Sequence, residues 1–411
     1  MADIKPFHGY RPLPHLADKI SSPPYDVISS DEARNIAQDN PSSFLRVIKP
    51  EIDFTPNNEP KGDALHEHGS ENLQRFIDDG KLVQDENICF YIYQIKMGNH
   101  TQTGIMAAVS VKEYNMGLIK QHEFTRPEKE NDRTRHIEIT NANTGPVFLT
   151  FRNDGQFQSR ISGMRNQTPN VSFTADDEII HTLWKIELSH QIDLLTDYFQ
   201  SIQSLYIADG HHRAASASRV QKIRKEANPY HSGDESYNYF MSVIFPNDEM
   251  QILDYNRIVK DLNGLTENQL LESIKPNFLL IPNAFPLAPN SPYSYSMFLN
   301  EKWYHLEAKD HIKSDDPVKG LDASILQNHL LDPILGIDDP RTNNRIDFVG
   351  GIRGLEELER RCLLDAAVAF VLHPVTIEDL LAVADAGKVM PPKSTWFEPK
   401  LRSGLVVRLL D

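Results

Sequence analysis

A short apolar run that ends abruptly in a turn sets the narrowest limits on how this chain can fold. The run covers residues 204–208 and stops at Asp209-Gly210, and residues 214–227 then have the composition of a helix. Apolar runs of about four to eight residues bounded by turn signals are typical of buried strands. The segment therefore predicts a strand, a tight turn and a helix.

Other segments alternate between strand and helix signals. Apolar, β-branched or aromatic runs predict strands over residues 44–48, 88–96, 103–111, 146–151 and 237–245. Amphipathic or capped segments predict helices from Ser30 onward, over 63–79 and over 193–201, and the charged stretch 121–135 fits a helix with its charges outward. This order predicts a mixed α and β protein.

The length of 411 residues corresponds to two or three domains at about 150 residues each. We place the boundary after residue 262, so that residues 1–262 form one α/β domain and residues 263–411 form a second, α+β domain. The second domain would supply the loop 390–405. The stretch 282–292, rich in Asn and Pro, predicts a linker or a long hairpin connection.

The composition excludes several classes of protein. Lys and Arg total 42 against 58 Asp and Glu, and the net charge of −16 opposes attraction to nucleic acid or to an anionic membrane. Apolar stretches such as 363–372 are too short to span a bilayer, and Asp3 and Lys5 interrupt any apolar leader. The two cysteines lie in apolar runs, which favours a cytoplasmic protein without disulfides.

The Asp209–Arg213 turn offers the sharpest chemistry. Amides at a helix N-terminus attract anions, Arg213 adds a bidentate phosphate donor, and Gly210 permits a positive φ or a close ligand approach. Asp209 would cap the helix, hold Mg²⁺ or orient a histidine. A plain helix cap followed by surface histidines is the alternative, although the adjacent His-His-Arg favours an anion site.

A second candidate runs from Lys120 to Pro127 and on through Lys129, Asp132 and Arg133. Glu123 beside His122 would serve as a general base for a hydroxyl nucleophile, with the nearby cations binding anionic groups. A solvated helical face with ion pairs three and four residues apart explains the same composition equally well.

A third candidate is the loop that begins at Met390-Pro391-Pro392. The two prolines stiffen a loop on which Lys393, Ser394 and Thr395 present one charge and two hydroxyls suited to a phosphate or carboxylate. A structural turn whose Trp396 and Phe397 fill the core is the alternative. The sequence contains neither a Gly-x-x-x-x-Gly-Lys-Ser/Thr loop nor a Gly-x-Gly-x-x-Gly motif after a strand.

In several segments, the chain resembles the domain-of-unknown-function family 1015. The matching segments span the chain: 22–28 (SPPYDVI), 40–46 (NPSSFLR), 122–125 (HEFT), 208–213 (ADGHHR) and 390–405. The Asp-Gly-His-His-Arg turn is also similar to the phosphate-binding turn of the ParB/sulfiredoxin superfamily, which includes free serine kinases. That second resemblance covers only a few residues.

The resemblance implies an α/β (α+β) fold with a ParB/sulfiredoxin-like mixed-sheet core in the catalytic domain 1–262 and a larger, embellishing second domain. It also implies a phosphotransferase that acts on the hydroxyl of free serine or a similar small hydroxy acid. The donor would be pyrophosphate or a nucleotide. Pyrophosphate is favoured because the sequence contains no recognisable adenine pocket.

The same resemblance implies roles for the residues. Glu123 would deprotonate the acceptor hydroxyl, and Asp209, His211 and His212 would complete the catalytic set, with Asp209 also holding Mg²⁺. Phosphate and substrate contacts would come from Gly210, Arg213, His122, Thr125, Arg126, Lys129, Arg133, Lys393, Ser394, Thr395 and Lys400. The cations among them would neutralise charge on the transferred group.

Two other functions stay open at this stage. A phosphoserine phosphatase would use the same cations and base with water in place of the serine hydroxyl. A ParB-like nucleotide-binding regulator would clamp DNA, and the charge of −16 counts against it. We expect a small-molecule donor and acceptor as partners, with no nucleic acid or membrane, and a homodimer is one expected assembly.

Overall fold

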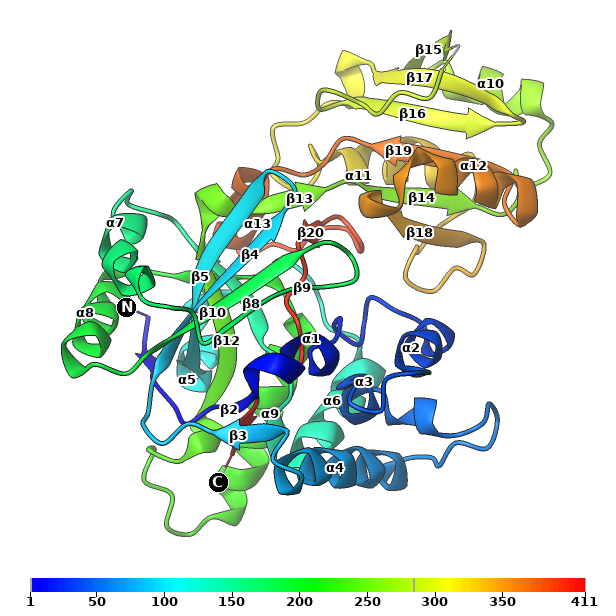
Figure 1. Ribbon diagram of the computed structural model, residues 1–411. Helices are drawn as coiled ribbons and strands as arrows, with labels where there is room; N and C mark the ends of the chain where they lie inside the picture. Colours follow the sequence, from blue (N-terminus) through cyan, green and yellow to red (C-terminus); the bar gives the residue numbers. More distant parts are fainter. Residues whose placement is uncertain (1, 284, 411) are drawn as a thin grey trace. The chain divides into compact units, whose positions relative to one another are not determined.

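The computed structural model describes residues 2–283 and 285–410, and the chain forms two compact units (Figure 1). Unit 1 consists of Met1–Gln121, Thr125–Met250 and Pro399–Asp411, and unit 2 of His122–Phe124 and Gln251–Glu398. This division differs from the boundary placed after residue 262, because unit 2 begins at Gln251 and the end of the chain returns to unit 1. The fold class is α+β, as the sequence predicts.

Unit 1 is built on a nine-stranded mixed sheet with the order β6-β11-β8-β12-β5-β4-β10-β9, and β1 pairs with β5 off this path. The pairs β11 with β6 and β12 with β8 are parallel, and the other neighbours are antiparallel. The strands are β1 Ile4–Lys5, β4 Phe90–Met97, β5 His100–Ser110, β6 Ile119–Lys120, β8 Val147–Phe151, β9 Val171–Thr174, β10 Ile180–Ile186, β11 Leu205–Asp209 and β12 Tyr239–Pro246.

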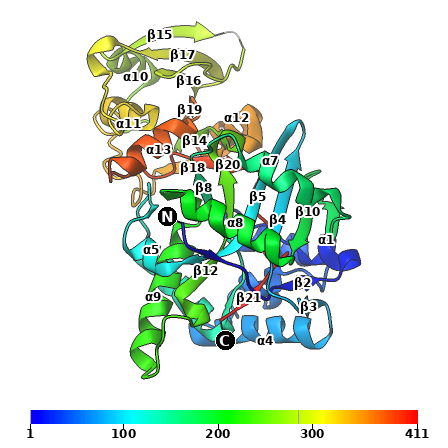
Figure 2. The same cartoon turned by 90° about the vertical axis from the view of Figure 1, so that its left-hand side faces the viewer.

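Unit 1 also contains α-helices. They are α1 Ala17–Ile20, α2 Ser30–Ala37, α3 Leu45–Ile48, α4 Asp63–Asp78, α5 Val111–Asn115, α6 Pro127–Thr140, α7 Phe157–Ser162, α8 Ser189–Ser201 and α9 His211–Ala227. Helices α7 and α8 bury Phe157, Leu195 and Phe199 in the sheet core and lie in front of the strands in Figure 2. Helix α6 packs against both α4 and α9.

Two short ribbons tie the ends of the chain to unit 1. Strand β2 (Tyr10–Pro12) pairs with β3 (Leu82–Gln84), and β21 (Arg408–Leu409) pairs with β7 (Ala142–Asn143), each antiparallel. The second ribbon explains why the last segment belongs to unit 1.

The strand predicted over residues 44–48 is wrong, because this segment forms the short helix α3. Phe44, Leu45 and Val47 are all fully buried in a cluster with residues of α2 and α4. The α3 helix is four residues long, little more than one turn, so the pattern of this mostly apolar segment does not separate a buried strand from a buried helix. The hydroxyl of Ser43 accepts a hydrogen bond from the Leu45 amide at 3.4 Å, which supports a helical start.

Unit 2 contains a six-stranded antiparallel sheet with the order β15-β17-β16-β19-β14-β18. Its strands are β14 Tyr255–Val259, β15 Phe278–Asn283, β16 Ser294–Leu299, β17 Lys302–Ala308, β18 Ile346–Gly350 and β19 Val368–Leu372. Successive strand residues face opposite sides. Phe370 packs in one core cluster, whereas its neighbours Ala369 and Val371 pack in another.

Each face of this second sheet has its own helices. Helices α10 (Glu267–Ile274) and α11 (Asp322–Leu326) belong to the larger cluster, and α12 (Gly354–Leu364) contributes Leu358 to the other. Helix α13 (Ile377–Asp385) follows β19, and β13 (Gln251–Leu253) pairs with β20 (Trp396–Glu398).

The stretch 282–292 lies within unit 2 and connects β15 to β16, and both of these strands pair with β17. Ala284, inside this stretch, lies outside the described residues. Across residues 2–283 and 285–410, no helix combines the length and the apolar composition needed to cross a membrane.

Candidate functional site

The predicted strand, turn and helix at residues 204–227 are confirmed. Strand β11 ends at Asp209, Gly210 has a φ of 94°, and α9 begins at His211. The left-handed conformation at Gly210 favours glycine, because a Cβ there would strain the backbone. Gly210 precedes the first turn of α9, whose amides have no partner within the helix, so anions are favoured here.

Asp209 and Lys400 meet at this turn. The Lys400 Nζ lies 3.2 Å from Asp209 Oδ2, and the Gly210 amide donates to Asp209 Oδ1 at 2.8 Å. Burial alone would raise the pKa of Asp209, but the charges of Lys400 and Arg213 hold it well below its ordinary range. Asp209 is therefore ionised. The sequence predicted roles for both residues without predicting their contact.

Arg213, in the first turn of α9, carries a second positive charge. One of its terminal nitrogens donates to the Pro146 carbonyl, and the other lies 3.7 Å from Asp26 Oδ2. Its buried Nε has no hydrogen-bond partner among the described residues. A guanidinium with an unused donor can accept a further anionic partner.

A small cavity of about 30 Å³ lies beside Arg213. It is lined by Tyr25, Ile48, Arg133, His136, Ile137, Asn143, Thr144, Gly145, Val147, Arg213, Phe240, Met241 and Ser403. Two guanidinium groups, an imidazole and three hydroxyls give this lining a positive, hydrogen-bonding character. Such a volume accommodates one or two water-sized groups, such as the oxygens of a small oxyanion.

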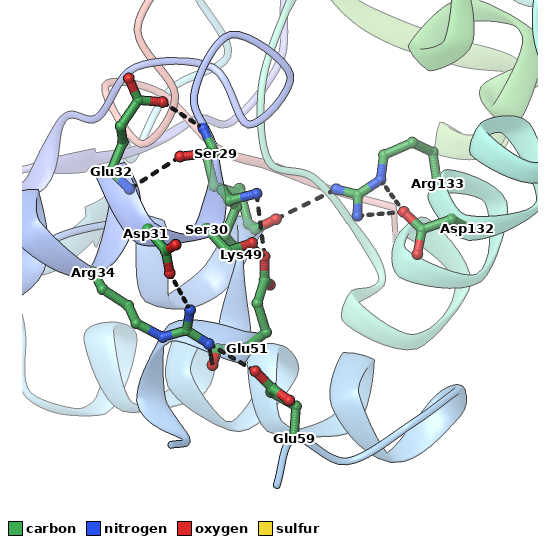
Figure 3. A network of polar contacts seen from close by, with 11 residues as sticks. Ser29, Ser30, Asp31, Glu32, Arg34, Lys49, Glu51, Glu59, Asp132 and Arg133 are labelled. Carbon is green, nitrogen blue, oxygen red and sulfur yellow. Dashed lines mark hydrogen bonds and ion pairs between the residues drawn. The ribbon is translucent and has the colours of Figure 1, made fainter. Parts of the chain in front are cut away.

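Arg133 is held firmly at this cavity. Its Nε and Nη2 donate to Asp132 Oδ2 at 2.9 and 2.6 Å, and Nη1 donates to the Ile48 carbonyl at 3.5 Å (Figure 3). Its guanidinium carbon also lies 4.1 Å from the centre of the Tyr25 ring, a cation–π contact. A cation with this many restraints is pre-organised.

His136 lies one helical turn after Arg133 on α6. Its Nε2 is 3.1 Å from the Thr144 hydroxyl, and its buried Nδ1 has no hydrogen-bond partner among the described residues. Burial, with the nearby charge of Arg133, lowers the pKa of His136 well below its ordinary value. His136 is therefore neutral, so one of its ring nitrogens can donate a hydrogen bond and the other can accept one.

The remaining predicted residues of unit 1 lie around the start of α6. The Arg126 amide donates to His212 Nε2 at 2.9 Å, which links this segment to α9. The Thr125 hydroxyl donates to Glu130 Oε2 at 2.8 Å. Lys129 and the Arg126 side chain are exposed. The structure thus connects His212 with Arg126, whereas among the described residues Lys129 makes no hydrogen bond or ion pair with the Asp209–Arg213 turn.

The other predicted residues belong to unit 2. His122 accepts the Met390 amide on its carbonyl at 2.8 Å, and its Nε2 lies 3.4 Å from the Thr395 hydroxyl. The Ser394 hydroxyl donates to the Pro391 carbonyl at 2.7 Å. Ser394 therefore shapes its own loop, as the structural alternative for this segment proposed. His122 and Thr395 are brought together.

Lys393 and Glu123 are also residues of unit 2. Lys393 Nζ lies 5.4 Å from the centre of the Tyr255 ring, a cation–π distance. Glu123 is half-buried. Its role as a general base stays a prediction.

Sequence reasoning missed Tyr25, Asp26, His136, Thr144 and Ser403 as site residues. Two signals were present. Tyr25 and Asp26 lie inside the 22–28 segment that carried the family resemblance, and His136 is three residues after Arg133 and so shares its helix face.

A model of the family described as "Protein of unknown function (DUF1015)" matches residues 4–324. The chain belongs to this family. The match includes β11, the Asp209–Arg213 turn and all of α6, but ends before Lys393 and Lys400. None of the curated proteins compared with the chain matches it.

Several solved structures are similar at low identity. A conserved hypothetical protein from Pyrococcus furiosus shares 13% identity with a TM-score of 0.36, covering 74% of this chain and 95% of its own. A free serine kinase in complex with AMP shares 11% with a TM-score of 0.34, covering 74% and 92%. C-terminally truncated SbnI from Staphylococcus aureus shares 13% with a TM-score of 0.38, covering 74% and 87%.

Proposed function

We propose that the chain is a phosphotransferase that binds donor phosphates at the Asp209–Arg213 turn and phosphorylates the hydroxyl of free serine or a similar small hydroxy acid. The observation that carries the proposal is the arrangement of Lys400 and Arg213 around Gly210 at the N-terminus of α9. Asp209 and Asp26 balance the charges of Lys400 and Arg213, and the Arg213 Nε and the amides in the first turn of α9 are the donors left for an anion. A polyphosphate would accept hydrogen bonds from these donors.

The positive cavity beside Arg213 supports the acceptor assignment. Arg133, Arg213 and the Ser403 hydroxyl would bind the carboxylate of the acceptor, which is a planar oxyanion suited to guanidinium donors. His136, neutral and with an unpartnered Nδ1, would supply one further hydrogen bond.

Asp209 fits the role of a Mg²⁺ ligand. Its carboxylate is ionised, and each oxygen makes one contact, with the Gly210 amide or with Lys400, which leaves lone-pair capacity on both. Mg²⁺ is commonly held by one or two carboxylates together with substrate phosphates. When bound, the ion would neutralise charge on the donor phosphates.

The transfer balances without a further reactant. The acceptor hydroxyl oxygen forms a bond to the terminal phosphorus of the donor, and the bond from that phosphorus to the bridging oxygen breaks. The hydroxyl proton passes to the base, for which Glu123 is the predicted residue. Pyrophosphate would leave as inorganic phosphate, and a nucleotide would leave with one phosphate fewer.

Phosphorus NMR tests the proposal. The purified chain is incubated with serine, Mg²⁺ and, in separate samples, pyrophosphate, ADP or ATP, and we expect phosphoserine to form from at least one donor. No phosphoserine from any donor would contradict the proposal. Release of inorganic phosphate from phosphoserine in the absence of an acceptor would instead identify a phosphatase.

A further inference from the structure

A second cavity, of about 300 Å³, lies in unit 2, and none of the residues proposed above for phosphate or acceptor binding lines it. Its walls include the rings of Pro292, Tyr293, Pro317 and Pro374 together with Leu321 and Val375. Asp315, Asp316, Asp322 and Asp379 also line it. The cavity therefore combines apolar walls with carboxylates, and its volume is at the lower limit typical of small-molecule sites.

Two of these carboxylates make contacts that stabilise the fold. Asp316 pairs with Lys388 at 2.6 Å and accepts the amides of Val318 and Lys319 at 2.9 and 3.1 Å. Asp379 caps helix α13 by accepting the amide and the hydroxyl of Thr376. Their negative charges are explained by structure alone.

Asp322 is different. Asp322 lies at the start of α11 and is only 8% exposed, and its hydrogen-bond partners are neutral: the Tyr293 amide donates to Oδ1 at 2.8 Å, and the Tyr295 hydroxyl is the other. Among the described residues, no lysine or arginine pairs with Asp322. A buried carboxylate without a cation is costly, because it loses hydration and gains no opposite charge.

The surroundings of Asp322 increase this cost. Burial raises its pKa to about 7, and the negative charge of Asp379 acts in the same direction. Two lysines next to lining residues have other partners: Lys313, which precedes Ser314 in the chain, pairs with Asp310 at 2.8 Å, and Lys388 pairs with Asp316. A positively charged ligand would supply the opposite charge that the Asp322 carboxylate lacks.

The ligand is better matched by an organic cation than by a metal ion. In the described parts of the chain, no set of three ligand atoms within 4.8 Å of one another includes Asp322. Divalent cations need several oxygen ligands, whereas one carboxylate suffices for an ammonium group. The proline and tyrosine walls suit a hydrocarbon chain.

We propose that this cavity binds a small organic ammonium ion, with its charged group on Asp322 and its carbon chain against the walls formed by Pro292, Tyr293 and Pro374. This cavity shares no lining residue with the proposed phosphate site, and the proposal does not depend on the proposed function.

Saturation-transfer NMR on the full chain at pH 8 tests the proposal, with n-butylammonium as the probe and 1-butanol as its neutral counterpart. We expect saturable binding of the ammonium, at least tenfold weaker in Asp322→Asn and unchanged in Asp332→Asn, which removes an exposed carboxylate outside the cavity. Equal binding to Asp322→Asn, binding of 1-butanol as tight as that of the ammonium, or no saturable binding would overturn it.

Hydrogen exchange supplies a readout that does not depend on the variant folding. We expect n-butylammonium to slow amide exchange in wild-type residues 314–322 and 373–379, which contain the cavity lining. Protection confined to other segments, or an equal effect of Mg²⁺ at the same ionic strength, would contradict the proposed site.

Discussion

Asp209 shows how one side chain can serve both the fold and the proposed chemistry. Its two oxygens contact the Gly210 amide and Lys400, so the carboxylate fixes the turn while lowering the positive charge that faces a ligand. Removing Asp209 and removing Lys400 should therefore affect ligand binding in opposite directions.

We expect Lys400→Met to weaken pyrophosphate binding by roughly tenfold or more, since a charged hydrogen bond contributes about 1.5–3 kcal/mol. In the absence of Mg²⁺, Asp209→Asn should retain or tighten pyrophosphate binding, and with Mg²⁺ present it should abolish turnover. Calorimetric titration alongside the NMR assay measures both effects. Lys222→Met, at an exposed position on α9, is the matched control. Weaker binding in Asp209→Asn than in Lys400→Met would refute this assignment.

Glu123 offers a separate test of the base role. Glu123→Gln should lower turnover by about 10²- to 10⁴-fold while donor affinity is retained, because a general base acts on the transferred proton. Single-turnover kinetics with a binding measurement distinguish the two effects. Loss of donor binding as the sole defect would remove Glu123 from this role.

Asp322 predicts a pH dependence in unit 2. Its pKa of about 7 in the folded chain exceeds the ordinary value, so its contribution to stability is present below about pH 4 and is lost as the pH rises through 7. Between pH 5 and 8 this loss amounts to roughly 3 kcal/mol. Amide exchange in β16 should show the loss in the wild type and a much smaller loss in Asp322→Asn. The same pH dependence of amide exchange in the wild type and in Asp322→Asn would show that Asp322 does not titrate in this range.

At the scale of the element, the junction between β11 and α9 depends on Gly210. Gly210→Ala should destabilise unit 1 by about 1–2 kcal/mol, because an L-residue is strained at a φ of 94°. Gly163→Ala is the control: its φ is −63° and a Cβ there meets nothing within 4 Å, so it should be neutral or slightly stabilising. Urea unfolding measures both. Equal stabilities for the two variants would show that the turn relaxes.

The elements that could be predicted from the sequence are those with local signals. The α4 helix has an amphipathic pattern and β12 a run of strand-forming residues, and both were found within a few residues of their bounds. Helix α3 was mistaken for a strand because it is only four residues long and mostly apolar. About one helical turn is too short for a helical period to appear in the sequence.

The candidate site was predicted only in part for a similar reason. The Asp209–Arg213 turn has a local signature, whereas the contact between Asp209 and Lys400 joins residues 191 positions apart. Such contacts depend on where the chain returns, and the sequence offered no signal that the segment after Glu398 goes back to unit 1.

At the scale of the whole molecule, the return of residues 399–411 to unit 1 stabilises that unit. Leu405, Val406 and Val407 are buried, and β21 pairs with β7. Each fully buried aliphatic side chain contributes about 1.5–3 kcal/mol, so loss of the segment would remove most of the stability of a typical domain.

Deletion of residues 399–411 should therefore unfold unit 1 and leave the sheet of unit 2 protected. Hydrogen exchange resolved by segment measures this: exchange in β5 and β12 should become fast, and exchange in β16 and β19 should stay slow. Protection of β5 equal to that of the full chain would refute the structural role of the segment.

A crystal structure grown with pyrophosphate and Mg²⁺ tests the phosphate site most directly. We expect a phosphate group within hydrogen-bond distance of the backbone at Gly210–Arg213 and of Lys400 Nζ. Pyrophosphate bound elsewhere, with no contact to the turn at Gly210, would rule out the proposed phosphate site.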